Sequence, residues 1–105
     1  MSGPLSSAVN ANDTQSIGNH GLLITQMGLG GTSYANMYSA VNEDVAVDVI
    51  TAAYNAGIRY FDTAPLYGFG LSESRLGAGL AQVDREKCVL STKVGYTLIP
   101  RSDAD

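Results

Sequence analysis

Three residues of this 105-residue chain, Asp62, Tyr67 and Lys93, have the types and spacing needed for acid–base chemistry. Asp62 ends one predicted strand, Tyr67 lies in the loop that follows, and Lys93 is near the end of the next predicted strand. An ammonium group beside a phenol stabilises the phenolate, and a carboxylate keeps the ammonium charged and oriented. Together the three groups would let Tyr67 act as a general acid or base. Spacing alone leaves a structural alternative open, in which a turn residue, a loop aromatic and a strand-end lysine have no common task.

The elements that must position these residues alternate between strands and helices. Two short strands are predicted within 22–29, one over 58–62 and one over 88–94. These runs are rich in aliphatic and aromatic residues. Such alternation indicates right-handed βαβ units and a parallel sheet, which binds ligands at the carboxyl ends of its strands. A closed (β/α)8 barrel needs about 250 residues. The predicted fold class is therefore α/β, the N-terminal part of a (β/α)8 TIM barrel with about three βα units.

Two helices are predicted between the strands. The first begins after Asn42, whose side chain can cap it, and ends before Gly57, a common residue after a helix. The second runs from Ser72, as its N-cap, through Leu80. The apolar spacing of the first helix predicts that its buried face consists of Val45, Val49, Ala52, Ala53 and Ala56.

Residues 1–20 are predicted to form a disordered tail, and residues 21–105 a partial barrel. The tail is rich in Ser, Asn and Gly without hydrophobic periodicity, so it cannot bury enough surface to offset its ordering entropy. The N-terminus lacks the basic and apolar regions of a secretory signal, and no apolar run has the length of a membrane span. We therefore expect a cytoplasmic protein without a membrane partner.

Composition excludes several classes of site. The net charge is −4, from 10 acidic and 6 basic residues, and no basic cluster exists that could bind nucleic acid. With one cysteine and one histidine, the chain has no CxxC or paired-histidine metal site. Cys88 is expected to be a buried, inert thiol. Glu73 and Arg75 are expected to be solvated on the second helix.

Longer motifs then suggest a family. Residues 57–68 read GIRYFDTAPLYG and closely resemble the signature of the aldo-keto reductases. The segments 71–77, LSESRLG, and 90–95, LSTKVG, resemble two further blocks of that family. The resemblance covers about residues 22–98 and implies hydride transfer between NADP or NAD and a carbonyl compound. Residues 36–41 and 67–73 are similar to the aldose and galactose dehydrogenase branch, which implies an aldehyde or sugar substrate oxidised at its hemiacetal carbon.

The resemblance also implies a role for individual residues. Asp62, Tyr67 and Lys93 match three members of the family's catalytic tetrad, with Tyr67 as the proton donor or acceptor. Gly31 and Thr32 match the end of the first barrel strand, which together with Asp62 adjoins the nicotinamide. The glycines that precede them do not complete the GxGxxG fingerprint of a Rossmann fold, in agreement with a barrel that binds the cofactor in another way.

The sequence departs from the family pattern in one important respect. The tetrad histidine belongs after the next strand, beyond Asp105, and His20 cannot replace it because it precedes the first strand. The family's contacts to the pyrophosphate and adenosine come from still later strands. We therefore expect the chain by itself to be inactive.

Two other functions remain open at this point. A lysine at the end of a barrel strand can form a Schiff base, so Lys93 could serve a lyase. Alternatively, the chain could be a non-catalytic barrel fragment that acts by association. Its open sheet edge would expose unpaired backbone groups, through which copies of the chain could pair with each other.

Overall fold

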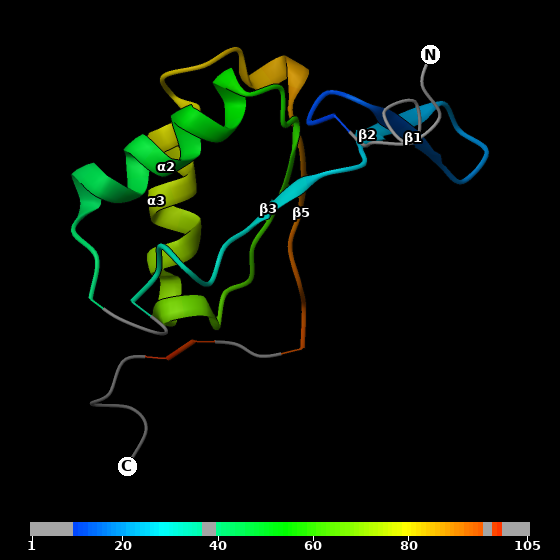
Figure 1. Cartoon of the computed structure of the whole chain (residues 1–105). Coiled ribbons are helices and arrows are strands. Elements are labelled where there is room, and N and C mark those ends of the chain that lie inside the picture. The colour runs from blue at the N-terminus through cyan, green and yellow to red at the C-terminus, as the bar shows by residue number, and fades with distance from the viewer. Residues whose placement is uncertain (1–9, 37–39, 96–97, 100–105) are drawn as a thin grey trace.

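A parallel sheet of three short strands forms the centre of the computed structural model, which describes residues 10–36, 40–95 and 98–99 (Figure 1). The strands are β3 (Gly28–Gly30), β4 (Tyr60–Asp62) and β5 (Val89–Ser91), in that order. The register pairs the last residue of β4, Asp62, with Gly30 on one side and Ser91 on the other. The carboxyl ends of the three strands therefore meet at one edge of the sheet, as the predicted alternation requires.

Two helices connect these strands and lie on the same side of them (Figure 1). Helix α2 (Glu43–Asn55) joins β3 to β4, and helix α3 (Leu71–Leu80) joins β4 to β5. Two short 3-10 turns, η1 (Tyr67–Gly70) and η2 (Arg85–Lys87), precede α3 and β5. Neither helix of the described part of the chain has the length and apolar character to cross a membrane.

The ends of α2 lie where the sequence predicts them. The Asn42 side chain accepts a hydrogen bond from the Val45 amide at 2.9 Å, as an N-cap does. After the helix, Gly57 adopts a φ of 110°, a left-handed conformation that glycine allows at low cost.

The predicted buried face of α2 is wrong. Val45 and Val49 are 47% and 38% exposed, whereas Ala46 and Ile50 are fully buried. The helix carries two adjacent apolar stripes, and only the second, which includes the half-buried Ala53, faces α3 and the sheet. Helical spacing identifies both stripes but cannot tell which one the sheet will cover.

Helix α3 begins without the predicted Ser72 cap. Its N-cap is Gly70, which has no side chain to accept a capping hydrogen bond. Ser72 lies inside the first turn and is fully buried, and its hydroxyl bonds the Thr63 hydroxyl at 2.6 Å. The serine is thus used to join α3 to the segment after β4.

A hairpin precedes the sheet, and its first strand lies in the region predicted to be tail. Strand β1 (Thr14–Ile17) pairs antiparallel with β2 (Leu22–Thr25), and the hairpin projects from the body of the molecule (Figure 1). The turn between them uses Gly18 and Gly21 with positive φ. Three polar residues and one isoleucine do not show a strand period on their own, so the pairing with β2 defines β1. Residues 1–9 lie outside the described residues.

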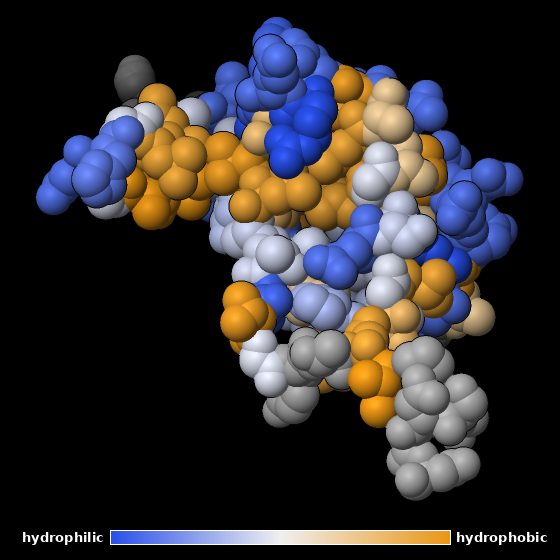
Figure 2. Space-filling view, turned by 180° about the vertical axis from the view of Figure 1, so that it is seen from behind, coloured by the Kyte–Doolittle hydropathy of each residue, from blue (hydrophilic) through white to orange (hydrophobic). Residues whose placement is uncertain are grey.

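Hydrophobic side chains gather over this hairpin (Figure 2). Ile17, Leu22 and Leu23 are each about half exposed. By contrast, Phe61, Ile50 and Leu76 are fully buried in the core between the sheet and the helices. Cys88 is buried at its edge, and burial raises the pKa of its thiol, as expected of an inert cysteine.

Candidate active site

Lys93 is bound to Asp62 at the carboxyl edge of the sheet. The Lys93 ammonium donates to both carboxylate oxygens, Oδ1 at 3.1 Å and Oδ2 at 3.0 Å. It also donates to the Thr63 carbonyl at 3.3 Å. Asp62 is the last residue of β4 and Lys93 follows β5, so the parallel register of the two strands brings the pair together. The predicted contact is confirmed.

Tyr67 completes the group from the loop after β4. The Lys93 nitrogen lies 4.8 Å from the centre of the Tyr67 ring. The loop turns sharply beyond Tyr67, where Gly68 and Phe69 have φ values of 63° and 53°. A side chain at Gly68 would collide with the Ala35 carbonyl. The chain can therefore turn directly after Tyr67 because residue 68 is a glycine.

A small cleft of about 100 Å³ adjoins these residues. Its walls are mainly apolar and consist of Ala64, Pro65, Leu66, Tyr67, Lys93 and Val94. A phenol and an ammonium group in a mainly apolar wall are suited to orient one polar group of a small ligand.

The electrostatics of the pair favour two charged groups. Partial burial raises the pKa of Asp62, but the hydrogen bonds from Ser91 and Lys93 and the charge of Lys93 outweigh it and lower that pKa below its ordinary value. The Tyr67 hydroxyl and then Asp62 raise the pKa of Lys93. At neutral pH the structure therefore holds a carboxylate and an ammonium.

Gly31 and Thr32 come directly after β3, as predicted, and the last residue of β3, Gly30, pairs with Asp62 across the sheet. Gly31 is buried, and a side chain there would collide with the Ser72 hydroxyl and lie 2.8 Å from the Asp62 carbonyl. Gly30 has no atoms near the position of a Cβ. The edge of β3 is thus open at Gly30 and tightly packed at Gly31.

Arg75 was expected to be solvated, and this prediction is wrong. It is only 7% exposed, and its guanidinium donates to the Tyr34 carbonyl at 2.6 Å and the Asn36 amide oxygen at 3.1 Å. These contacts hold the loop after β3 against α3. The sequence signal is helical spacing, because Arg75 lies three residues after Ser72 and four before Gly79, which are buried on the same face of α3. Glu73 is exposed as predicted and accepts from the Thr92 hydroxyl at 3.1 Å.

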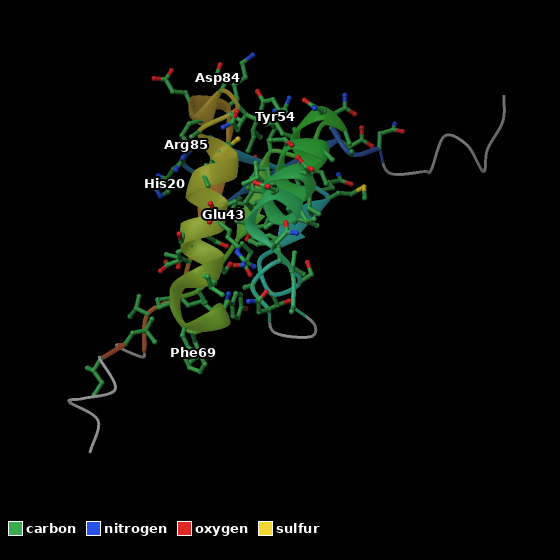
Figure 3. The ribbon with its side chains drawn as sticks, turned by 90° about the vertical axis from the view of Figure 1, so that its left-hand side faces the viewer. His20, Glu43, Tyr54, Phe69, Asp84 and Arg85 are labelled. Atoms are coloured by element: carbon green, nitrogen blue, oxygen red, sulfur yellow. The ribbon has the colours of Figure 1, made fainter. Side chains whose placement is uncertain are left out.

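His20 lies far from this group. It belongs to the turn of the hairpin, and β2 leads into the amino end of β3, opposite the edge that carries Asp62. Figure 3 shows His20 well separated from Phe69, which projects at the start of α3. The structure agrees that His20 takes no part in the candidate site.

The sequence matches a known family over most of its length. Residues 26–104 fit the Aldo/keto reductase family. The chain belongs to the aldo/keto reductase family. Its partial parallel sheet with two covering helices is the N-terminal part of the barrel of these oxidoreductases, as predicted.

Curated relatives in this family include three dehydrogenases. The D-threo-aldose 1-dehydrogenase of a Pseudomonas species is 48% identical over 83 residues, which cover 79% of this chain and 25% of that protein. The pyridoxal 4-dehydrogenase of Microbacterium luteolum is 39% identical over 83% of this chain and 25% of its own length. The L-galactose dehydrogenase of Arabidopsis thaliana is 39% identical over 79% of this chain and 27% of its own length. The chain thus spans about a quarter of these relatives.

Solved structures of aldo-keto reductases superpose on the chain. The holo form of an enzyme from Bacillus halodurans gives a TM-score of 0.71 at 30% identity and covers 82% of this chain and 27% of its own. The glycerol dehydrogenase of Gluconobacter oxydans gives 0.69 at 33% identity over 87% of this chain and 28% of its own. The fold of the family is therefore present in this part of the chain.

Proposed function

We propose that the chain carries the Asp62, Lys93 and Tyr67 part of an NAD(P)-dependent aldo-keto reductase active site that acts on an aldose-like substrate. The observation that carries this proposal is the position of Lys93. Its ammonium bonds both oxygens of Asp62 and lies 4.8 Å from the centre of the Tyr67 ring. The identity to an aldose 1-dehydrogenase supports the substrate class.

In this reaction Tyr67 exchanges a proton with the substrate oxygen. In the direction of oxidation, the phenolate oxygen of Tyr67 takes the proton of the anomeric hydroxyl as hydride leaves that carbon, and a lactone results. In the direction of reduction, the Tyr67 hydroxyl gives a proton to the carbonyl oxygen. Lys93 stabilises the phenolate by its charge, and Asp62 holds Lys93 in place.

The residues at the edge of β3 fit the nicotinamide end of the cofactor. Gly30 leaves open space at the carboxyl edge of the sheet, and Thr32 and the Asp62 carboxylate border that edge. When bound, the nicotinamide would accept or supply the hydride. Gly31, Thr32 and Asp62 would hold and orient its ring, while the choice between NADP and NAD depends on contacts to the rest of the cofactor.

The geometry disfavours a Schiff-base reaction at Lys93. A lysine attacks a carbonyl only as the neutral amine, and such lysines are usually desolvated or placed near another cation. Lys93 is instead bound to a carboxylate, and its neighbours Tyr67 and Asp62 raise its pKa. We therefore rank the lyase below the hydride transfer.

The test compares Tyr67→Phe with Tyr54→Phe in a protein that also carries the remaining strands of the barrel, because the chain by itself is expected to be inactive. Tyr54 lies on α2 under the Arg59 guanidinium, so its variant loses a phenol hydroxyl away from the site. Turnover of aldoses with NAD⁺ and NADP⁺ would be followed by nicotinamide absorbance. We expect Tyr67→Phe to lose about 10²- to 10⁴-fold in kcat, the usual contribution of a general acid or base, and Tyr54→Phe to keep full turnover.

Two results would contradict the proposal. Tyr67→Phe could turn over as fast as the unchanged protein, which would remove the tyrosine from the chemistry. Alternatively, borohydride could trap a substrate adduct on Lys93, which would assign the site to a Schiff-base reaction.

A further inference from the structure

Two hydroxyl groups extend the site along the face of the sheet that lies opposite the two helices. The Ser91 hydroxyl donates to Asp62 Oδ1 at 2.5 Å, and the Tyr60 hydroxyl lies 3.0 Å from the Ser91 oxygen. Tyr60 and Asp62 are two residues apart on β4, so both side chains project to the same face. Ser91 is the register partner of Asp62 on β5. The resulting chain of contacts runs from Tyr60 through Ser91 and Asp62 to Lys93.

The direction of these hydrogen bonds follows from the charge of Asp62. A carboxylate can only accept hydrogen bonds, so the Ser91 hydroxyl must donate its single hydrogen to Asp62. The oxygen of Ser91 is then an acceptor, and the Tyr60 hydroxyl must donate to it. Among the described residues, Ser91 is the only residue of β5 that donates to the Asp62 carboxylate. It bonds Oδ1, which also accepts from Lys93.

We propose that Ser91, oriented by Tyr60, is a positioning residue that fixes the Asp62 carboxylate so that Asp62 can hold Lys93 beside Tyr67. This inference rests on the proposed function, in which those three residues form the catalytic group. Without the Ser91 bond the carboxylate could rotate about its last torsion, because Asp62 is a third exposed and its other partner, Lys93, is half exposed and flexible.

The side chain of Ser91 is not needed to build the sheet. Its carbonyl accepts from the Thr63 amide at 2.9 Å, and this backbone bond is independent of the hydroxyl. The Tyr60 ring is placed separately, since Gly28 on β3 leaves room for it. A side chain at Gly28 would lie 2.9 Å from Tyr60 Cδ2. Removal of either hydroxyl should therefore leave the strands paired.

Several groups face Asp62 and must be considered in any titration. Lys93 faces it from the segment after β5, and Tyr60 reaches it through Ser91. The charge of Asp62 also acts on Tyr34, which is buried in the loop after β3. Burial raises the pKa of Tyr34, the Ser72 hydroxyl opposes this, and the charge of Asp62 adds to the rise. Helices α2 and α3 pack on the other face of β4, against Phe61.

The experiment is an NMR titration of the Asp62 carboxyl carbon in the 105-residue chain and its variants. We expect Ser91→Ala to move the Asp62 midpoint to higher pH, because the carboxylate loses a donor. Ser91→Thr restores a hydroxyl on a side chain suited to a strand and should return the midpoint. The matched control is Thr92→Ala, whose hydroxyl bonds Glu73 instead of Asp62 and should leave the midpoint unchanged.

An Asp62 midpoint that stays the same in folded Ser91→Ala would overturn the inference. If Ser91→Ala does not fold, as judged by circular dichroism, Tyr60→Phe decides, since it keeps the ring and the serine. A smaller shift in the same direction would support the inference, and an unchanged midpoint would overturn it.

The titration is separable from the proposed function because it needs no turnover. A Ser91 effect in this chain, together with no dehydrogenase turnover in a protein that also carries the remaining strands of the barrel, would keep the positioning role and contradict the proposed reaction. Turnover without the titration effect would support the proposed reaction and overturn the positioning role of Ser91. With both, Ser91→Ala should also lose about ten- to a hundredfold in kcat, the value of one hydrogen bond to a charged group.

Discussion

Phe61 and Asp62 are neighbours on strand β4, yet they face two different regions of the molecule. Phe61 is fully buried between the sheet and the two helices, among Ile50, Leu76 and other apolar side chains. Asp62 is part-exposed on the other face, where it accepts hydrogen bonds from Ser91 and Lys93. One face of a three-residue strand therefore serves packing and the other serves polar interactions.

The difference between the faces shows how stability and chemistry can be kept apart in so short an element. The packed face gains free energy from the apolar surface that it removes from water. The polar face gains little, because its ion pair remains in contact with solvent. Substitutions on the two faces should therefore affect different quantities.

The pair Phe61→Ala and Asp62→Asn tests this separation most directly. Phe61→Ala should lower the free energy of unfolding by about 3–5 kcal/mol, because it leaves a cavity in a closed core. Asp62→Asn should change it far less, but should move the Lys93 titration to lower pH by removing the charge beside it. Urea unfolding and NMR titration measure the two effects. Comparable losses of stability in both variants would mean that the faces are not separable.

A smaller effect is expected from two glycines of α3 that differ only in what they face. A methyl group at Gly79 would lie 2.6 Å from Ile50 Cγ2, so Gly79→Ala should destabilise the chain by about 1–3 kcal/mol through overpacking. At Gly77 nothing lies within 4 Å, so Gly77→Ala should stabilise it by about 0.5–1 kcal/mol through higher helix propensity. Thermal or urea unfolding of the two variants would show opposite signs. Equal signs would contradict the close approach of α2 and α3.

The smallest effect is the pH dependence of stability that comes from the polar face. The pKa of Asp62 is lowered in the folded chain, so its contribution is present above the unfolded pKa and is lost as pH falls through the folded pKa. The pKa of Lys93 is raised, so its contribution is present below the unfolded pKa and is lost as pH rises through the folded pKa. Asp62→Asn should flatten the acid limb of a stability-against-pH curve. An unchanged acid limb would assign it to other carboxylates.

Much of the fold and of the candidate site could be predicted from local signals. The Asn42 cap and the Gly57 terminus of α2 depend on residues within one turn, and both lie as predicted. The run from Gly57 to Gly68 indicated the family, which residues 26–104 match. Alternating strands and helices predicted the parallel sheet, and the sheet brings Asp62 and Lys93 together.

The predictions that were wrong concern contacts between distant parts of the chain. Strand β1 exists through its pairing with β2, and Arg75 is buried because the loop after β3 covers it. Ser72 looked like a helix cap until Thr63 became its partner. No local pattern contains the information on which segment will lie against a given side chain.

By itself, the sequence of this protein determined its family, the order of its strands and helices, and three residues able to support acid–base chemistry. Only the tertiary structure decided that α2 buries Ala46 and Ile50 instead of Val45 and Val49. It also decided that Ser91 donates to Asp62 and contacts the Tyr60 hydroxyl. The physical reason is the range of the interactions. Helix caps and intrinsic propensities act over a few residues. Burial and series of hydrogen-bonded side chains depend on segments that are far apart in the sequence, as Asp62 and Ser91 are, 29 residues apart.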